Sequence, residues 1–111
     1  MAKTHIIYNV TISVDENQTS AWIHWMLNEH LREMMGTGCF LGFRFCELHT
    51  DQDMGPTYTV QYELASKADL DRYEKEFAPA MRKKSAQQFG EGALAFRSTM
   101  TILAKGELRD Q

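Results

Sequence analysis

The sequence lacks the features that mark membrane, secreted and nucleic-acid-binding proteins. No apolar run approaches the roughly 20 residues that cross a bilayer, and the N-terminal stretch MAKTHIIYNV lacks the continuous apolar core of a signal peptide. Lysines and arginines total 12 against 15 aspartates and glutamates, a formal net charge of −3, so the basic face that nucleic acid demands is missing. We therefore expect a cytoplasmic protein whose partners include neither nucleic acid nor a membrane.

Cysteine is also scarce, with only Cys39 and Cys46 in 111 residues. Both fall in one expected strand, seven positions apart. Their Cα atoms would then lie roughly 23 Å apart, which is too far for a disulfide between them. We expect two reduced thiols that behave as small apolar residues, in agreement with a cytoplasmic protein.

Motifs for metals, nucleotides and nucleophiles are absent as well. The four histidines lack metal-ligand spacing. The glycines at Gly36 and Gly38 follow a predicted helix, whereas a dinucleotide-binding loop follows a strand. No serine has the glycine setting of a nucleophile elbow. We therefore expect neither a metal nor a cofactor.

The sequence does contain alternating apolar and polar residues, interrupted by stretches with helical spacing. The alternation and an aromatic-rich stretch predict strands at residues 5–14, 39–49, 57–64 and 94–103. Apolar spacing, capping residues and terminal glycines predict helices at residues 22–35 and 67–89. Pro79 lies inside the second helix, so we expect a kink or break near residue 78.

The order of these elements is strand, helix, hairpin, helix, strand, which is the split β-α-β arrangement of ferredoxin-like folds. The predicted class is α+β, with a four-stranded antiparallel sheet and both helices on one face. We find no repeat and no linker, so we expect one domain over residues 1–111, with residues 105–111 as a solvated tail.

The second face of the predicted sheet mixes aliphatic, amide, hydroxyl and guanidinium side chains. Such a face is too polar for a dry core, yet two copies could pack across a two-fold axis around a polar cavity. Arg44 and Cys46 belong to it if Phe43 and Phe45 point to the core. Strand parity assigns the other members: Ile7, Asn9, Thr11, Thr59, Gln61, Arg97 and Thr99.

His30 has an unusual position on the first predicted helix. It lies in the middle of an apolar stripe, where the charged imidazole is disfavoured and the ring nitrogens need partners. One interpretation is an acid/base or ligand-contacting residue in a pocket. The other is a neutral core histidine bonded to a carbonyl or carboxylate. The stripe consists of Trp22, Ile23, Met26, Leu27, Leu31 and Met34.

Two further aromatic side chains of this helix lie off the stripe. Trp25 would then be exposed and offer a large apolar contact surface, unless neighbouring loops cover part of it. His24 shares the polar side with Asn28 and Arg32 and is interpreted as a surface histidine.

Polar residues of the second sheet face are candidates for ligand binding. Arg44 and Arg97 could hold a carboxylate or phosphate in bidentate fashion, or form ion pairs across a dimer interface. The remaining candidates could orient a small molecule or form interface hydrogen bonds: Asn9, Thr11, Gln61 and Thr99.

Several stretches together resemble a small bacterial family of unassigned function in the dimeric alpha-beta barrel superfamily. They are IIYNVTISVD, WIHWMLNEH followed by GTGCF, PTYTVQYEL, FAPAMRKKSAQQFG and ALAFRS, and they cover nearly the whole chain. The resemblance implies a ferredoxin-like fold and a homodimer whose two sheets face each other. It implies no reaction.

Relatives elsewhere in that superfamily include cofactor-free monooxygenases, haem-degrading enzymes, chlorite dismutase-like proteins, dehydratases and isomerases. Some monooxygenase-like members use an asparagine on the first strand with a tryptophan and a histidine. Asn9 lies on the first strand here, but both tryptophans lie on the first helix and depart from that pattern.

We therefore expect a homodimer that holds a small organic ligand between sheet and helices. Two alternatives stand beside it. One is a cofactor-independent lyase, isomerase or monooxygenase-like enzyme with His30 as the catalytic acid/base and with Asn9 and Arg97 orienting the substrate. The other is a structural or regulatory dimer with a fully packed interface.

Overall fold

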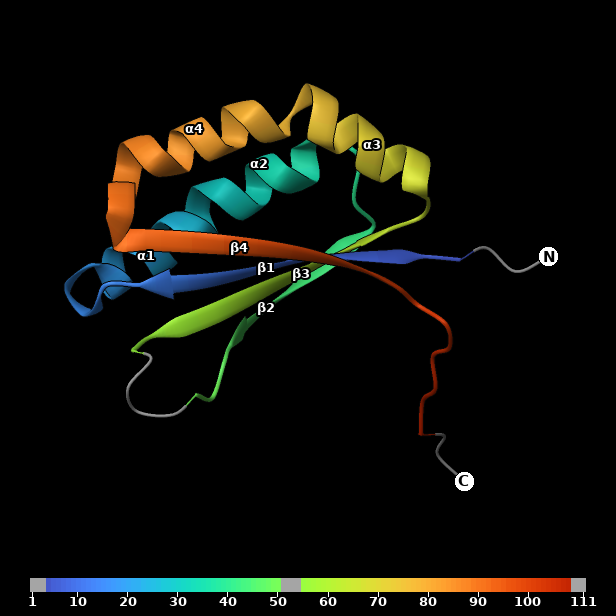
Figure 1. The fold of residues 1–111 in the computed structure, drawn as a ribbon, viewed down its shortest axis with the longest axis horizontal. Helices are drawn as coiled ribbons and strands as arrows, with labels where there is room; N and C mark the ends of the chain where they lie inside the picture. Colours follow the sequence, from blue (N-terminus) through green and yellow to red (C-terminus); the bar gives the residue numbers. More distant parts are fainter. Residues whose placement is uncertain (1–3, 51–54, 109–111) are drawn as a thin grey trace.

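The computed structural model describes residues 4–50 and 55–108. Its strands form one antiparallel sheet in the order β2-β3-β1-β4, and the helices cover one face of that sheet (Figure 1). This is the predicted ferredoxin-like arrangement. The strands are β1 (Ile6–Val14), β2 (Gly42–Glu47), β3 (Thr57–Leu64) and β4 (Ala93–Thr101). The helical segments are η1 (Glu16–Gln18), α1 (Thr19–Trp25), η2 (Met26–His30), α2 (Leu31–Gly36), α3 (Lys67–Glu76), α4 (Ala78–Phe89) and η4 (Gly90–Gly92).

The first long helix is α1, η2 and α2 in succession, and η2 is a π-helical turn. A π turn holds one more residue than an α turn, so it rotates everything after it relative to what precedes it. The expected exposure of Trp25 is therefore wrong, because its side chain is only 7% exposed. The expected burial of Leu27 is also wrong, because it is 54% exposed.

The break predicted near residue 78 is confirmed. Helix α3 begins after Ser66, whose side chain accepts a hydrogen bond from the Asp69 backbone N–H at 3.2 Å. It ends at Glu76, and α4 restarts at Ala78 with Pro79 in its first turn. Proline is tolerated there because the first helical N–H groups have no partner within the helix.

The core lies between the helices and one face of the sheet. Every second residue of β3 is buried, and these side chains meet the aromatic residues of β1 and the helices. Tyr8, Tyr62 and Tyr73 cluster with Phe40, with ring centroids 4.8–6.4 Å apart. Burying such rings supplies most of the hydrophobic stabilisation of a domain this small.

The residues of β4 that face the helices are not the predicted ones. Arg97 lies opposite Val10 and Thr99 opposite Tyr8, and residues opposite each other on antiparallel strands share a face. The placement of Arg97 and Thr99 on the second face is therefore wrong, since both lie on the helix-covered face. Leu94, Phe96 and Met100 take the second face instead and are exposed.

The start of β4 is joined to the segment that follows β1. The Asp15 backbone N–H donates to the Gly92 carbonyl at 2.8 Å. A Cβ atom at position 92 would lie 1.6 Å from Gln18 Oε1, so a larger residue there would require the end of the Gln18 side chain to move.

Parity is correct for the remaining polar candidates. Arg44 pairs with Gln61, Asn9 also pairs with Gln61 across β1 and β3, and Thr11 pairs with Thr59. These side chains share the sheet face away from the helices, here called the open face. Its members are Ile7, Asn9, Thr11, Arg44, Cys46, Thr59, Gln61, Leu94, Phe96, Ser98 and Met100.

Both cysteines are free thiols, as predicted. Cys39 is buried ahead of β2, which is shorter than predicted, and Cys46 is exposed within β2. Residues 105–108 of the predicted tail are exposed, while residues 109–111 and part of the predicted turn at 50–56 lie outside the described residues. Within the described ranges, no helix has the length and apolar character to cross a membrane.

Candidate functional site

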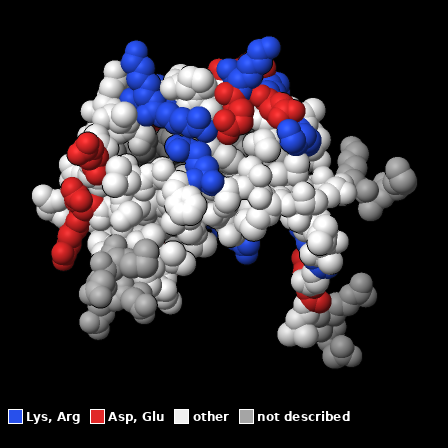
Figure 2. Space-filling view, in the orientation of Figure 1, with Lys and Arg blue, Asp and Glu red and all other residues white. Residues whose placement is uncertain are grey.

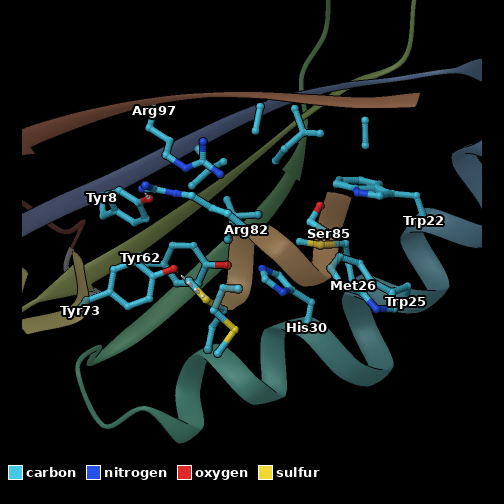
Figure 3. Close-up of a pocket in the computed structure, with 17 residues that line it drawn as sticks. Tyr8, Trp22, Trp25, Met26, His30, Tyr62, Tyr73, Arg82, Ser85 and Arg97 are labelled. Carbon is cyan, nitrogen blue, oxygen red and sulfur yellow. Dashed lines mark hydrogen bonds between the residues drawn. The ribbon is translucent and has the colours of Figure 1, made fainter. Parts of the chain in front are cut away.

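A pocket lies between the helices and the sheet, at the end where α4 faces β4 (Figure 3). We call it the helix–sheet pocket. Its cavity volume is about 50 Å³. It is therefore a narrow slot for a small molecule. The polar side chains that line it are Tyr8, His30, Tyr62, Tyr73, Arg82, Ser85 and Arg97.

Apolar side chains form the other part of the pocket wall. Trp22, Trp25 and Met26 come from the first long helix, and Val10 and Ile12 come from β1. Figure 3 shows the tryptophans at one end and the two arginines with Tyr8 toward the other. A mostly apolar slot with a few convergent polar groups is the usual form of a small-molecule site.

His30 ends the π turn and points from the helix into the pocket (Figure 3). Its ring stacks on Trp25, with centroids 4.7 Å apart and planes 19° apart. Its Nδ1 atom is buried and, among the described residues, has no hydrogen-bond partner. A ligand in the pocket would reach this nitrogen only if the side chains that cover it moved aside.

Burial lowers the pKa of His30 to about 4, because the apolar wall disfavours the charged ring. The Glu33 carboxylate opposes this shift, while Lys84 and Arg97 lower the pKa further. Glu33 and Lys84 themselves form an ion pair across the neighbouring helices. His30 is therefore neutral near pH 7, when its two ring nitrogens offer one donor and one acceptor.

Two arginines border the pocket. Arg82 Nη2 donates to the Tyr8 hydroxyl at 3.2 Å and to the Glu74 carboxylate at 3.1 Å, and the bond to Tyr8 raises the pKa of Arg82. Arg97 is exposed on the edge strand β4. Its positive charge adds to the effect of burial in lowering the pKa of His30, and it partly opposes the effect of burial on the pKa values of Tyr62 and Tyr73. The electric field of Arg97 therefore extends over the pocket.

The tyrosines supply hydroxyl groups that stay protonated. Burial raises the pKa values of Tyr62 and Tyr73 above the usual value for a phenol. The Tyr73 hydroxyl lies 3.3 Å from Met34 Sδ, which is a weak acceptor. Both phenols are therefore neutral at any physiological pH.

The predicted ligand-binding residues fall into two groups on opposite sides of the sheet. Arg97 joins His30 at the helix–sheet pocket. Thr99 shares that face of the sheet but does not line the pocket. The others occupy the open face, where they bond to one another: Asn9 with Thr11 at 3.3 Å, and Arg44 with Gln61 at 2.9 Å.

Sequence reasoning missed Arg82 and Ser85. Ala78, Arg82, Ser85 and Phe89 follow one another at spacings of four, three and four, which places them on one face of α4. Ala78 is fully buried, so this face looks inward. The signal is present in the sequence, but the predicted stripe of the second helix contained only apolar residues, Leu70, Tyr73, Phe77 and Met81, and no polar residue beside them was considered.

Solved structures with the same fold share little sequence with this chain. HapK from Hahella chejuensis has a TM-score of 0.68 and 14% identity, over 96% of this chain and 99% of that one. A conserved protein of unknown function from Bacteroides thetaiotaomicron has a TM-score of 0.65 and 17% identity, over 91% and 100%. A dimeric ferredoxin-like protein from an uncultured marine organism has a TM-score of 0.64 and 10% identity, over 95% and 100%. At such identities the similarity shows the fold alone.

No curated protein matches the chain in sequence. A family model does match it, over residues 5–103, and this span includes every strand, every helix and the pocket. The chain belongs to the family described as the domain of unknown function DUF4286.

Proposed function

We propose that this protein binds a small organic molecule in the helix–sheet pocket. The observation that carries the proposal is His30, which lines an apolar cavity and whose buried Nδ1 has no hydrogen-bond partner among the described residues. A buried polar atom left without a hydrogen bond costs stability. A ligand that bonds to it would remove this penalty.

Native mass spectrometry with a panel of fragment-sized aromatic compounds, neutral, anionic and cationic, tests this proposal. The variant Ala95→Phe places a ring at the pocket wall, because Ala95 lines the pocket and is exposed. Ala86→Phe is the matched control at an exposed position on α4 away from the pocket wall. We expect panel members to bind the wild type and A86F but not A95F. Equal binding by A95F, or no binding at all, would contradict the proposal.

We also propose that two copies associate through their open faces. The open face carries Leu94, Phe96 and Met100 on β4, with exposed fractions of 61%, 68% and 44%. Large exposed apolar side chains gathered on one strand are typical of a surface that binds another protein. Figure 2 shows many of the charged side chains over the helices. A structurally similar protein is described as dimeric, which agrees with this proposal.

Size-exclusion chromatography with light scattering tests the dimer. Phe96→Glu introduces a charge into the open face, whereas Leu27→Glu replaces another exposed apolar side chain, on the helical layer. We expect the wild type and L27E to be dimers at micromolar concentration and F96E to be a monomer. A monomeric wild type, or a dimeric F96E, would contradict this interface.

A second candidate is a cofactor-independent enzyme in which His30 transfers a proton. The position of His30 at an apolar pocket favours it. A ring whose pKa is about 4 is a weak base at pH 7, so a proton-transfer role would require the bound ligand to raise that pKa. Asn9, which was predicted to orient the substrate, lies on the opposite side of the sheet and would act only in a separate site.

Loss of C–H signals in D2O tests the enzyme candidate, with small ketones and 2-oxo acids as probes. We expect wild type and His24→Gln to speed the exchange of acidic C–H bonds and His30→Gln to lose that effect. His24 is exposed on the same helix and serves as the control. Equal rates for wild type and H30Q would exclude His30 as the acid/base.

A further inference from the structure

We propose that the ligand of the helix–sheet pocket is a small carboxylic acid, bound as its anion. Its carboxylate would lie between Arg82 and Arg97 at the opening, and its apolar body would lie toward Trp22 and Met26. This inference rests on the proposed function and adds the chemical class of the ligand.

The charge of the pocket lining supports an anionic ligand. Two arginines line the pocket, and none of the 17 lining residues is an aspartate or glutamate. Glu74 lies outside the lining and pairs with Arg82, so Arg97 supplies the positive charge that has no acidic partner among the described residues. The chain as a whole has a formal net charge of −3. A small cleft with charge of one sign concentrates ligands of the opposite sign.

The two arginines have hydrogen-bond donors left for a ligand. Among residues 4–50 and 55–108, none forms a hydrogen bond or ion pair with the Arg97 side chain. Arg82 bonds to Tyr8 and Glu74 through Nη2 alone, whereas a guanidinium has five N–H donors. Both arginines therefore keep donors for a carboxylate, which they bind in planar, paired geometry.

The position of the arginines matches an anion with an apolar body. The Arg82 side chain is 41% exposed and Arg97 is exposed, so a carboxylate between them keeps contact with water. Most of the remaining lining is aromatic and aliphatic. A charged end at the opening and an apolar end inside minimises the desolvation cost of the charge.

Benzoate and benzamide form a matched pair of probes, because they have nearly the same shape and differ in charge. Trp22 and Trp25 are the only tryptophans, and both line the pocket, so their two indole N–H signals in ¹H–¹⁵N spectra report occupancy. We expect benzoate to shift these signals at concentrations at least about tenfold below those needed for benzamide, as an ionic hydrogen bond supports. Raised salt should weaken benzoate binding and leave benzamide binding unchanged.

Arg97→Gln should weaken benzoate binding about tenfold and leave benzamide binding unchanged. Arg44→Gln is the control, because it removes an arginine from the open face. Equal affinity for the two probes, or an unchanged benzoate affinity in R97Q, would overturn the carboxylate inference. The proposal that the pocket binds small molecules would still hold if, in the mass-spectrometry panel, neutral compounds bind the wild type and A95F does not bind them. A panel without any pocket ligand would overturn both proposals.

Discussion

Trp25 and His30 stack on each other across the π turn of the first long helix, with ring centroids 4.7 Å apart. They are five residues apart in sequence. In an α-helix, residues five apart point about 140° away from each other, whereas a π turn bonds each residue to the fifth one along and brings the two onto one face. The π turn therefore places both the imidazole and the indole at the helix–sheet pocket.

Deleting Leu27 should convert the π turn into a regular α-helix. The buried residues before and after it would then follow one another with ordinary α-helical spacing, so the core is kept. We expect the free energy of unfolding to change by less than about 1.5 kcal/mol, as measured by urea denaturation.

Deleting Arg32 is the matched control, because Arg32 is also exposed but lies in the α-helical part. This deletion rotates the buried Met34 out of the core and should cost about 2–5 kcal/mol. Equal losses of stability in the two deletion variants would contradict the view that the π turn contains one extra residue that can be removed without disturbing the core.

The stability of the protein should fall as the pH is lowered from 6.5 toward 4. An unfolded histidine binds its proton near pH 6.5, whereas burial holds the pKa of His30 at about 4 in the folded state. The unfolded chain therefore gains protons first, and the wild type loses about 3 kcal/mol once His30 must be charged.

Comparing wild type, His30→Gln and His24→Gln by urea denaturation across this pH range isolates the effect. H30Q should lose less stability than the wild type on acidification, while H24Q should follow the wild type because His24 is exposed. Parallel curves for the wild type and H30Q would contradict a buried, neutral His30.

The two cysteines should differ in their reaction with iodoacetamide. Cys39 is buried, so it should react only after denaturation, while Cys46 is exposed on the open face and should react in the folded monomer. If open faces pair, Cys46 should react more slowly in the wild type than in Phe96→Glu. Mass spectrometry of timed samples measures both rates, and an equal Cys46 rate in the two proteins would argue against pairing through this face.

Ser66→Ala should cost about 1 kcal/mol of stability, because it removes the cap of α3. Ser20→Ala is a control at an exposed helical serine and should change stability by less than about 0.5 kcal/mol. Chemical denaturation gives both values. A loss in S66A no larger than in S20A would mean that the capping hydrogen bond contributes nothing.

The parts of the fold that depend on local pattern could be predicted from the sequence. Alternation in β1 and β3, the glycine after the first long helix and Pro79 in the second each act within a few residues, so their effects are visible there. The same holds for His30, because its place on an apolar stripe is visible in the sequence and predicts an unusual histidine.

The remainder depends on contacts between distant residues. Both sides of β4 carry apolar residues, so its periodicity cannot decide between Phe96 and Arg97 for the core. Its pairing with the distant strand β1 places Arg97 opposite Val10 and Phe96 opposite Thr11. The π turn shifts the helix by a single residue, which no periodicity over so short a stretch resolves. These two effects account for the errors at Arg97, Thr99 and Trp25.

Methionine-methyl NMR tests the central claim, that small molecules bind between the helices and the sheet, most directly. Met26, Met34 and Met81 line the helix–sheet pocket, whereas Met100 lies on the open face with the other predicted ligand-binding residues. With [¹³C-methyl]methionine protein titrated with benzoate, we predict shifts of the three pocket methyl signals and a stationary Met100 signal. A shift confined to Met100 would contradict the account and place the ligand on the open face.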